Sequence, residues 1–345
     1  MSGNEAAAEG AIRAGCRFYA GYPITPQNEL IAYMADQLPL RGGAFVQAES
    51  ELAAINMVFG ASAAGVRAMT SSSSPGVSLK QEGISYLAAC ELPAVVVNVQ
   101  RGGPGLGDIR PSQGDYFQAT RGGGHGDYRT ITVAPSTVQE MAELTHMAFE
   151  LADKWRNPAL VLADGMVGQM MEGVRLDRLA EPSPPAKPWA LTGAAGRPKN
   201  LVRSLFIRPG ELLEHNLKLH AKYRELARTE MRFALSGSEE PDVVLVAFGT
   251  CARIAGQVVA DPPGGLRGRL ALLRPITLWP FPYEPLAALA QGARAVVSVE
   301  MSAGQLVEDV RLAVEGRCPV HLFCRLVPSV PTAGEMADYL VDLFA

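Results

Sequence analysis

Through about residue 170, short apolar runs alternate with longer segments whose apolar positions recur at helical spacing. The short runs are rich in β-branched residues and are bounded by polar turns, as is typical of strands buried on both faces. This alternation predicts an α/β fold with a parallel sheet covered by helices. The expected strands lie near residues 18–20, 44–47, 67–71, 94–100, 130–134 and 159–163. The expected helices begin near Thr25, Glu51, Gly76 and Ser136.

The alternation stops between residues 174 and 240. The proline-rich run at residues 181–188 is unsuited to regular structure and predicts an extended arm or linker. A charged helix is expected from about Gly210 to Leu235. The histidines on it, His215 and His220, are expected to be solvated rather than to bind a metal.

A second α/β unit is expected from residue 241 onward, with strands near residues 243–250, 270–273, 295–299 and 320–323. Gly249 and Gly304 each lie where a strand leads into a helix, which is the edge where open α/β sheets bind ligands. The chain therefore divides into a first unit, a linker arm with a helix, and a second unit, at residues 1–173, 174–240 and 241–345.

Composition limits the function classes. The chain has 345 residues, more than one ordinary hydrophobic core accommodates, and 48% of them are hydrophobic. The formal net charge of -4 gives no basic surface for a polyanion, so nucleic acid is not an expected partner.

Cysteine usage and hydropathy indicate the compartment. The five cysteines are scattered and form no Cys-x-x-Cys pair, which argues against a conventional iron–sulfur or zinc site on this chain. The sequence has no signal peptide and no apolar run near the roughly 20 residues of a membrane span. We therefore expect a cytoplasmic protein with reduced cysteines.

One carboxylate lies where water is scarce. The run at residues 47–51, which ends in Glu51, precedes a helix of almost only small and apolar residues, 52–61. Desolvation raises the pKa of a carboxyl group, so a glutamate here is suited to share a proton with a ligand nitrogen near neutral pH. Thiamine diphosphate needs such a carboxyl group, because its aminopyrimidine ring must be protonated at one nitrogen.

Three polar features follow expected strands. Thr25 either caps the next helix or points into a crevice at the sheet edge. The turn at residues 71–76 offers hydroxyl and N–H groups at a helix start, suited to an anion or carboxylate, although a plain polar loop explains it equally well. Arg101 follows the most hydrophobic strand and is placed to clamp a substrate carboxylate with two hydrogen bonds.

Two glycine-dense loops are open to several interpretations. The glycines at residues 102–107 follow the fourth strand and include Pro104, so they do not favour a dinucleotide-binding turn. The loop at residues 121–129 is expected to be a flexible lid or a partner contact. A serine hydrolase is disfavoured, because the sequence has no Gly-x-Ser-x-Gly motif.

Taken together, these motifs resemble the alpha subunit of the 2-oxoacid:ferredoxin oxidoreductases. The resemblance covers essentially the whole chain and rests on six motifs in order, at residues 3–6, 21–26, 47–51, 73–79, 101–104 and 299–305. Within the family, residues 102–129 are most similar to the branched-chain, or 2-oxoisovalerate, type. The 2-oxoglutarate type is the nearest alternative.

The resemblance implies a fold, partners and a reaction. Residues 1–173 would form a thiamine-diphosphate pyrimidine-binding domain, and residues 241–345 a transketolase C-terminal-like domain. A separate beta subunit would hold the diphosphate, its Mg²⁺ and a [4Fe–4S] cluster, alongside gamma and ferredoxin-like delta subunits. The complex would convert a 2-oxo acid and coenzyme A to acyl-CoA and CO₂ and reduce ferredoxin.

The resemblance also assigns residues. Glu51 would protonate the aminopyrimidine ring, with Glu49 as the competing position. Thr25 and Arg101 would hold the carboxylate and oxo group of the substrate. Further cofactor contacts would come from Pro23, Ile24, Ser74 and Gly76.

One departure from the family pattern affects residues 301–305. Ser302-Ala303 stands where relatives more often have asparagine, which leaves open a coenzyme A or domain-contact role there. Two other functions remain alternatives: a thiamine-dependent dehydrogenase component that passes its acyl group to lipoamide, and a non-catalytic scaffold that completes a partner's pocket.

Overall fold

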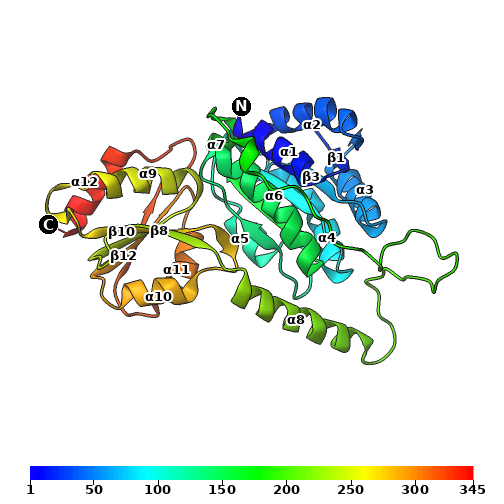
Figure 1. Cartoon of the computed structure of the whole chain (residues 1–345). Helices are drawn as coiled ribbons and strands as arrows, with labels where there is room; N and C mark the ends of the chain where they lie inside the picture. Colours follow the sequence, from blue (N-terminus) through cyan, green and yellow to red (C-terminus); the bar gives the residue numbers. More distant parts are fainter. Residues whose placement is uncertain (345) are drawn as a thin grey trace.

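The computed structural model describes residues 1–344, which form two α/β units connected by an extended arm and a long helix (Figure 1). The arm projects away from the first unit, and helix α8 (Glu211–Thr229) runs along that unit back toward the second (Figure 1). The predicted succession of two α/β units is confirmed. No helix among residues 1–344 is long and apolar enough to cross a membrane.

The first unit is built on an eight-stranded sheet with the order β11-β6-β7-β4-β3-β1-β2, and β5 pairs with β4 alone. The strands from β6 to β2 in this order are parallel, as the continuous apolar runs predict. The sheet's strands are β1 (Phe18–Gly21), β2 (Ala44–Gln47), β3 (Ala68–Ser72), β4 (Val95–Gly102), β5 (Asp108–Pro111), β6 (Ile131–Val133), β7 (Ala159–Asp164) and β11 (Thr277–Trp279).

Helices cover both faces of this sheet. Alternate residues of β4 point to opposite sides, so Val96 joins one core cluster while Val95 and Val97 join the other. One face packs on α1 (Gly3–Arg13), α2 (Asn28–Leu40) and α6 (Val138–Trp155). The other packs on α3 (Glu51–Ala63), α4 (Ser74–Ala89) and α5 (Tyr116–Arg121). A short helix, α7 (Gly165–Gln169), follows β7.

Helix starts follow local capping chemistry. Helix α3 begins at Glu51 as predicted, because the Ser50 hydroxyl accepts a hydrogen bond from the Ala53 N–H at 3.1 Å. Helix α2 begins at Asn28, three residues after the predicted Thr25. Helix α1 was not predicted, although its start carries a capping box in which the Ser2 hydroxyl accepts from the Glu5 N–H and the Glu5 carboxylate accepts from the Ser2 N–H.

The arm and helix at residues 174–240 depart from the prediction at their end. The arm is irregular apart from the 3-10 turn η1 (Leu176–Arg178). Helix α8 ends at Thr229 rather than near Leu235, because residues 233–237 form a strand, β8 (Phe233–Gly237), that pairs antiparallel with β10. His215 is not simply solvated: its Nε2 lies 2.8 Å from the Ala89 carbonyl and its ring stacks on Phe206.

The second unit has a five-stranded sheet with the order β13-β12-β9-β10-β8, in which only β8 is antiparallel. Its other strands are β9 (Val243–Val246), β10 (Leu270–Pro275), β12 (Ala295–Glu300) and β13 (Val320–Cys324). Around them lie α9 (Gly249–Ala260), η2 (Gly264–Leu266), α10 (Tyr283–Ala290), α11 (Leu306–Val314) and α12 (Ala333–Phe344). The strand predicted to reach Thr250 stops earlier, because α9 begins at Gly249, whose φ is +56°.

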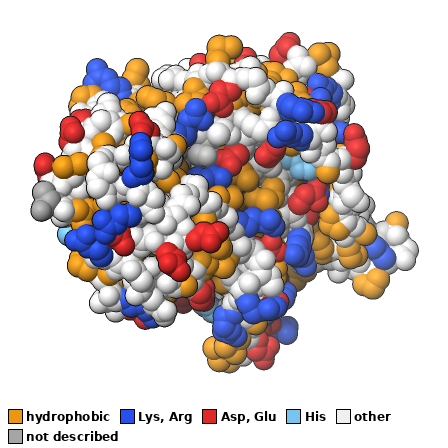
Figure 2. Space-filling view, turned by 60° about the vertical axis from the view of Figure 1, so that its left-hand side comes forward, with side chains coloured by type: hydrophobic (Ala, Val, Ile, Leu, Met, Phe, Trp, Pro, Cys, Tyr) orange, Lys and Arg blue, Asp and Glu red, His pale blue; other side chains and the backbone are white. Residues whose placement is uncertain are grey.

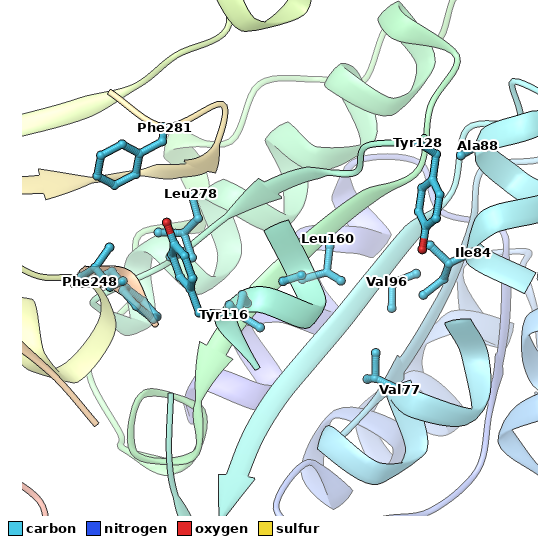
Figure 3. Packing of buried hydrophobic residues seen from close by; sticks show 14 of the residues in the cluster. Val77, Ile84, Ala88, Val96, Tyr116, Tyr128, Leu160, Phe248, Leu278 and Phe281 are labelled. Carbon is cyan, nitrogen blue, oxygen red and sulfur yellow. The ribbon is translucent and has the colours of Figure 1, made fainter. Parts of the chain in front are cut away.

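The two units share a continuous core. Tyr116 of the first unit packs against Phe248 of the second, with Leu278 and Phe281 alongside (Figure 3). Strand β11 lies in the second segment of the chain but pairs with β6 of the first sheet. The units are therefore held against each other through backbone pairing as well as side-chain packing.

Charged side chains of both signs are interspersed with hydrophobic ones on the face shown in Figure 2. No large area of a single sign is visible on that face. This distribution agrees with the small net charge of the chain.

Candidate active site

Four of the sequence motifs meet at one edge of the first sheet. Strands β4, β3, β1 and β2 are parallel neighbours, so their carboxyl ends lie side by side. The segments that leave these ends are residues 22–26, 48–51, 73–76 and 101–107. This is the edge at which open α/β sheets bind ligands, and it brings the predicted site residues Thr25, Glu51 and Arg101 together.

Arg101 holds the turn that contains Thr25. Its Nη1 donates to the Thr25 carbonyl at 3.0 Å, and its Nη2 donates to the Leu106 carbonyl at 3.0 Å. The Nε atom is buried and has no partner among residues 1–344. Because a guanidinium has five N–H donors, donors remain for a bound carboxylate.

The Thr25 hydroxyl does not cap helix α2. The N-cap residue of that helix is Gln27, without a side-chain capping bond. The Thr25 Oγ1 accepts only a long hydrogen bond, 3.3 Å, from the Asn28 side chain. The capping alternative is therefore not supported, and the hydroxyl stays half-exposed at the sheet edge.

Glu51 and Glu49 lie in different environments. Glu51 is 7% exposed at the first residue of α3, whereas Glu49 is exposed in the loop before it. Among residues 1–344, the Glu51 carboxylate accepts no hydrogen bond and forms no ion pair, although the Ser72 hydroxyl lies near it across Gly76. Only Glu51 therefore offers a buried carboxylate that is free to bind a nitrogen of a ligand.

Gly76 provides the space in which the Glu51 carboxylate lies. A Cβ atom at Gly76 would come within 2.6 Å of Glu51 Oε1 and 2.0 Å of Ser72 Oγ, so no other residue type fits without displacement. The hydroxyls of Ser72 and Ser73 are buried there without a hydrogen-bond partner in the described chain. An unpartnered carboxylate beside unpartnered hydroxyls fits a polar heterocycle such as an aminopyrimidine ring.

A buried network that the sequence did not reveal supports this edge. Asp115 Oδ2 accepts from Ser74 Oγ at 2.6 Å and from Asn98 Nδ2 at 2.9 Å, and Ser74 Oγ accepts from the Arg101 N–H at 3.0 Å. Burial raises the pKa of Asp115, and the bonds from Ser74 and Asn98 oppose that shift. The sequence held one signal, since Asn98 is the only polar residue among the valines at 95–99.

Residues 301–305 connect the two units. Gln113 N–H donates to the Met301 carbonyl at 2.8 Å, and Phe117 N–H donates to Gln305 Oε1 at 2.8 Å. Glu300, which is 1% exposed, accepts from the backbone N–H groups of Leu306 and others at the start of α11. The domain-contact role is thus observed for this segment.

A cleft of about 680 Å³ lies between these elements. Its walls include Ser74, Pro75, Ser78 and residues 103–105 of the first unit and Met301, Gln305 and Val327 of the second, with Asp115 beside them. Ser302 and Ala303 line it, although the Ser302 hydroxyl is bonded to Glu300. Ser74 joins this cleft to the sheet edge, whereas Thr25, Glu51 and Arg101 are not among the residues that line it.

The two glycine-dense loops have distinct structures. Residues 102–107 form the tip of a hairpin between β4 and β5 and open no helix, so they do not build a dinucleotide-binding turn. In the other loop, the Gly123 N–H donates to Gln81 Oε1 at 3.0 Å and the Gly124 N–H to the Tyr128 hydroxyl at 3.0 Å. This loop is anchored on α4, while His125 stays exposed.

Comparisons with known proteins agree with this geometry. Residues 9–231 match the family described as pyruvate flavodoxin/ferredoxin oxidoreductase, thiamine diP-bdg, and residues 241–335 match pyruvate:ferredoxin oxidoreductase core domain II. The chain belongs to this oxidoreductase family. The first match covers the first unit from residue 9 together with the arm and helix α8, and the second covers most of the second unit.

Several relatives align over most of the chain. The ketoisovalerate oxidoreductase subunit VorB of Methanothermobacter marburgensis is 51% identical over 91% of this chain and 89% of its own. The 2-oxoglutarate synthase subunit KorA of Archaeoglobus fulgidus is 42% identical over 90% of each chain. The similarity to the branched-chain type that the motifs predicted is thus confirmed at the level of these relatives.

A solved structure shows the same fold in a longer chain. The 2-oxoglutarate:ferredoxin oxidoreductase from Magnetococcus marinus, with 2-oxoglutarate, coenzyme A and succinyl-CoA bound, superposes with a TM-score of 0.82 at 27% identity. The match covers 100% of this chain but 65% of that chain. A split gene transketolase, at 14% identity and a TM-score of 0.57, shares the fold alone.

Proposed function

We propose that this chain is the alpha-type subunit of a thiamine-dependent 2-oxoacid:ferredoxin oxidoreductase that acts on 2-oxoisovalerate or a similar branched 2-oxo acid. The reaction converts the 2-oxo acid and coenzyme A to acyl-CoA and CO₂ and reduces ferredoxin. The observation that carries the proposal is the buried, unpartnered carboxylate of Glu51 at the same sheet edge as Thr25 and Arg101.

Each residue has a role that its environment supports. Glu51 holds a proton against the ring nitrogen of the aminopyrimidine, because its carboxylate has no competing donor. Ser74 and Gly76, with Pro23 and Ile24 of the β1 turn, bound the space for the ring. When bound, thiamine diphosphate supplies the carbanion that adds to the 2-oxo carbon.

Arg101 and Thr25 orient the substrate. Arg101 lies at the end of β4, and the N–H groups that its bonds to Thr25 and Leu106 leave free would bind the carboxylate of a 2-oxo acid. The Thr25 hydroxyl donates to the oxo group. Residues 301–305 are placed in the cleft wall where coenzyme A would approach.

Partners supply the remaining chemistry under this proposal. A beta subunit holds the diphosphate, Mg²⁺ and a [4Fe–4S] cluster, and gamma and ferredoxin-like delta subunits complete a cytoplasmic complex. The relatives are named as subunits, which supports the need for partners.

Purification of the chain together with the products of its neighbouring genes tests this function. Dye or ferredoxin reduction is then measured with a panel of 2-oxo acids and coenzyme A. We expect the highest kcat/KM with 2-oxoisovalerate. A preference for 2-oxoglutarate would assign the complex to the other type, and reduction of lipoamide in place of ferredoxin would contradict the proposal.

A further inference from the structure

Lys80 is a fully buried cation beside the proposed cofactor site. It lies on α4 and is 0% exposed. Its Nζ donates to Thr70 Oγ1 at 3.1 Å and to the Ser71 carbonyl at 3.5 Å, and it forms no ion pair within 4.0 Å among residues 1–344. A buried charge with so few partners is costly to the fold, which points to a reason other than stability.

The packing of α3 on α4 puts Lys80 on the face of α4 that Glu51 approaches. Gly76 makes room for the Glu51 carboxylate, and Gly83, two turns later, makes room for Ile55 of the same helix, at 2.6 Å from the position of its absent Cβ. Lys80 is four residues after Gly76 and three before Gly83, so it lies on the same face of α4, between these two contacts.

Among the described residues, burial and the charge of Glu51 have the main effects on the pKa of Lys80. Burial lowers the pKa of Lys80 to about 8, and the charge of Glu51 opposes this shift. Strand β3 presents only the neutral Thr70 and Ser71. Behind them, the Tyr19 hydroxyl of β1 bonds to Ser71 Oγ at 2.6 Å, and burial raises its pKa, so it also stays neutral.

We propose that Lys80 is a positioning residue for Glu51: its ammonium keeps the neighbouring carboxylate ionised until the cofactor binds, so that a proton enters the site together with the aminopyrimidine ring. This inference rests on the proposed function. Burial favours the neutral form of a carboxyl group, and a nearby ammonium favours the ionised form. With Lys80 present, the shared proton is taken up from solvent when the cofactor binds.

Proton uptake on cofactor binding tests the proposal without a turnover assay. Titration calorimetry of the purified complex with Mg²⁺ and thiamine diphosphate, between pH 6 and 7.5 in buffers of different ionisation enthalpy, counts the protons taken up. The matched ligand is the thiamine diphosphate analogue in which the ring nitrogen that faces Glu51 is replaced by carbon. Subtracting the proton count measured with the analogue from the count measured with the cofactor removes the protons that the diphosphate takes up or releases.

The wild-type complex should take up about one proton more with the cofactor than with the analogue. The ratio of its affinity for the cofactor to its affinity for the analogue should fall about tenfold for each unit by which the pH rises. In Lys80→Met, the extra proton uptake should be close to zero, and the affinity ratio should not change with pH. Lys222→Met is the matched control, because Lys222 is a second lysine whose pKa burial lowers to about 8, but it pairs with Glu91. The control should resemble the wild type.

The outcomes separate the two proposals. If the wild-type complex binds no thiamine diphosphate, the proposed function fails. If it binds and Lys80→Met takes up the same extra proton, the role of Lys80 is refuted.

A second measurement tests the proposal if the Lys80→Met chain does not assemble into the complex. Glu51→Gln removes the charge opposite Lys80, so its melting temperature should lie below that of the wild type at pH 7. The gap should close by pH 9, where Lys80 has lost its proton in both proteins. A gap that does not change with pH contradicts the coupling.

Discussion

Arg101 donates to the backbone carbonyl of Thr25 at 3.0 Å and so joins the ends of β4 and β1 across the intervening strand β3. Two motifs that are 76 residues apart in sequence therefore form one structural unit. A substitution at Arg101 changes both the charge at the site and the position of the Thr25 turn.

Arg101→Lys should lower kcat/KM by roughly one to two orders of magnitude, because an ammonium cannot reproduce the two parallel donors of a guanidinium. Steady-state kinetics with several 2-oxo acids checks this, and calorimetry should show that thiamine diphosphate still binds. Unchanged kinetics with every substrate would remove Arg101 from the substrate site.

Asp115 should affect stability through its buried partners. Asp115→Ala leaves the Asn98 side-chain amide without an acceptor, at a cost of about 1–3 kcal/mol, whereas the Ser74 hydroxyl keeps the Arg101 carbonyl at 3.2 Å. Denaturant unfolding of the chain measures this loss. Wild-type stability in Asp115→Ala would mean that water replaces the carboxylate.

The conservative variant Asp115→Asn should show a pH dependence. Burial raises the pKa of Asp115, so the folded state binds this proton more tightly than the unfolded state. The protonated form stabilises the fold at low pH, and that contribution is lost as the pH rises above the ordinary value of 3.8 and through the folded-state pKa. The variant should therefore gain stability relative to the wild type as the pH is raised.

Asp309 should hold the two units together. It is 0% exposed and accepts from the Tyr116 hydroxyl at 2.6 Å and from Arg121 at 3.0 Å, both on the first unit. Asp309→Leu should cost about 3 kcal/mol, since it leaves the partners of a buried charge unsatisfied. Unfolding should then separate into two transitions in calorimetry, whereas a single unshifted transition would show that the core contact of Tyr116 and Phe248 is sufficient.

The isolated chain should bind thiamine diphosphate weakly and have no activity, because under the proposed function it supplies only the pyrimidine half of the site. Titration calorimetry of the chain alone checks this. Tight binding by the chain without its partner would overturn the division of the site between subunits.

Much of the fold was predictable because buried parallel strands have continuous apolar runs. The run at residues 94–100 is an example, since β4 is covered on both faces. Helix α1 was missed although its sequence carries the Ser2–Glu5 capping box, because its buried positions are mostly small residues such as Ala6 and Ala7 rather than large apolar ones. Strand β8 was missed because its pairing with β10 is not local in the sequence.

The site was predictable only for charged residues that directly follow a predicted strand. Glu51 and Arg101 follow strands that end at one sheet edge, and this can be deduced from the sequence. The contact of Asp115 with Ser74 and Asn98 depends on how a distant loop folds back. Similarly, nothing in the sequence places the Lys80 ammonium beside Glu51 until α3 packs on α4.

The choice between Glu51 and Glu49 is the central claim, and exchange of the thiazolium C2 proton in the assembled complex tests it most directly. Glu51→Gln keeps the shape of the side chain but removes the shared proton, so exchange should slow by roughly 10²-fold or more. Glu49→Gln is the matched control, and because Glu49 is exposed it should change the rate little. Fast exchange in Glu51→Gln together with lost exchange in Glu49→Gln would contradict the assignment.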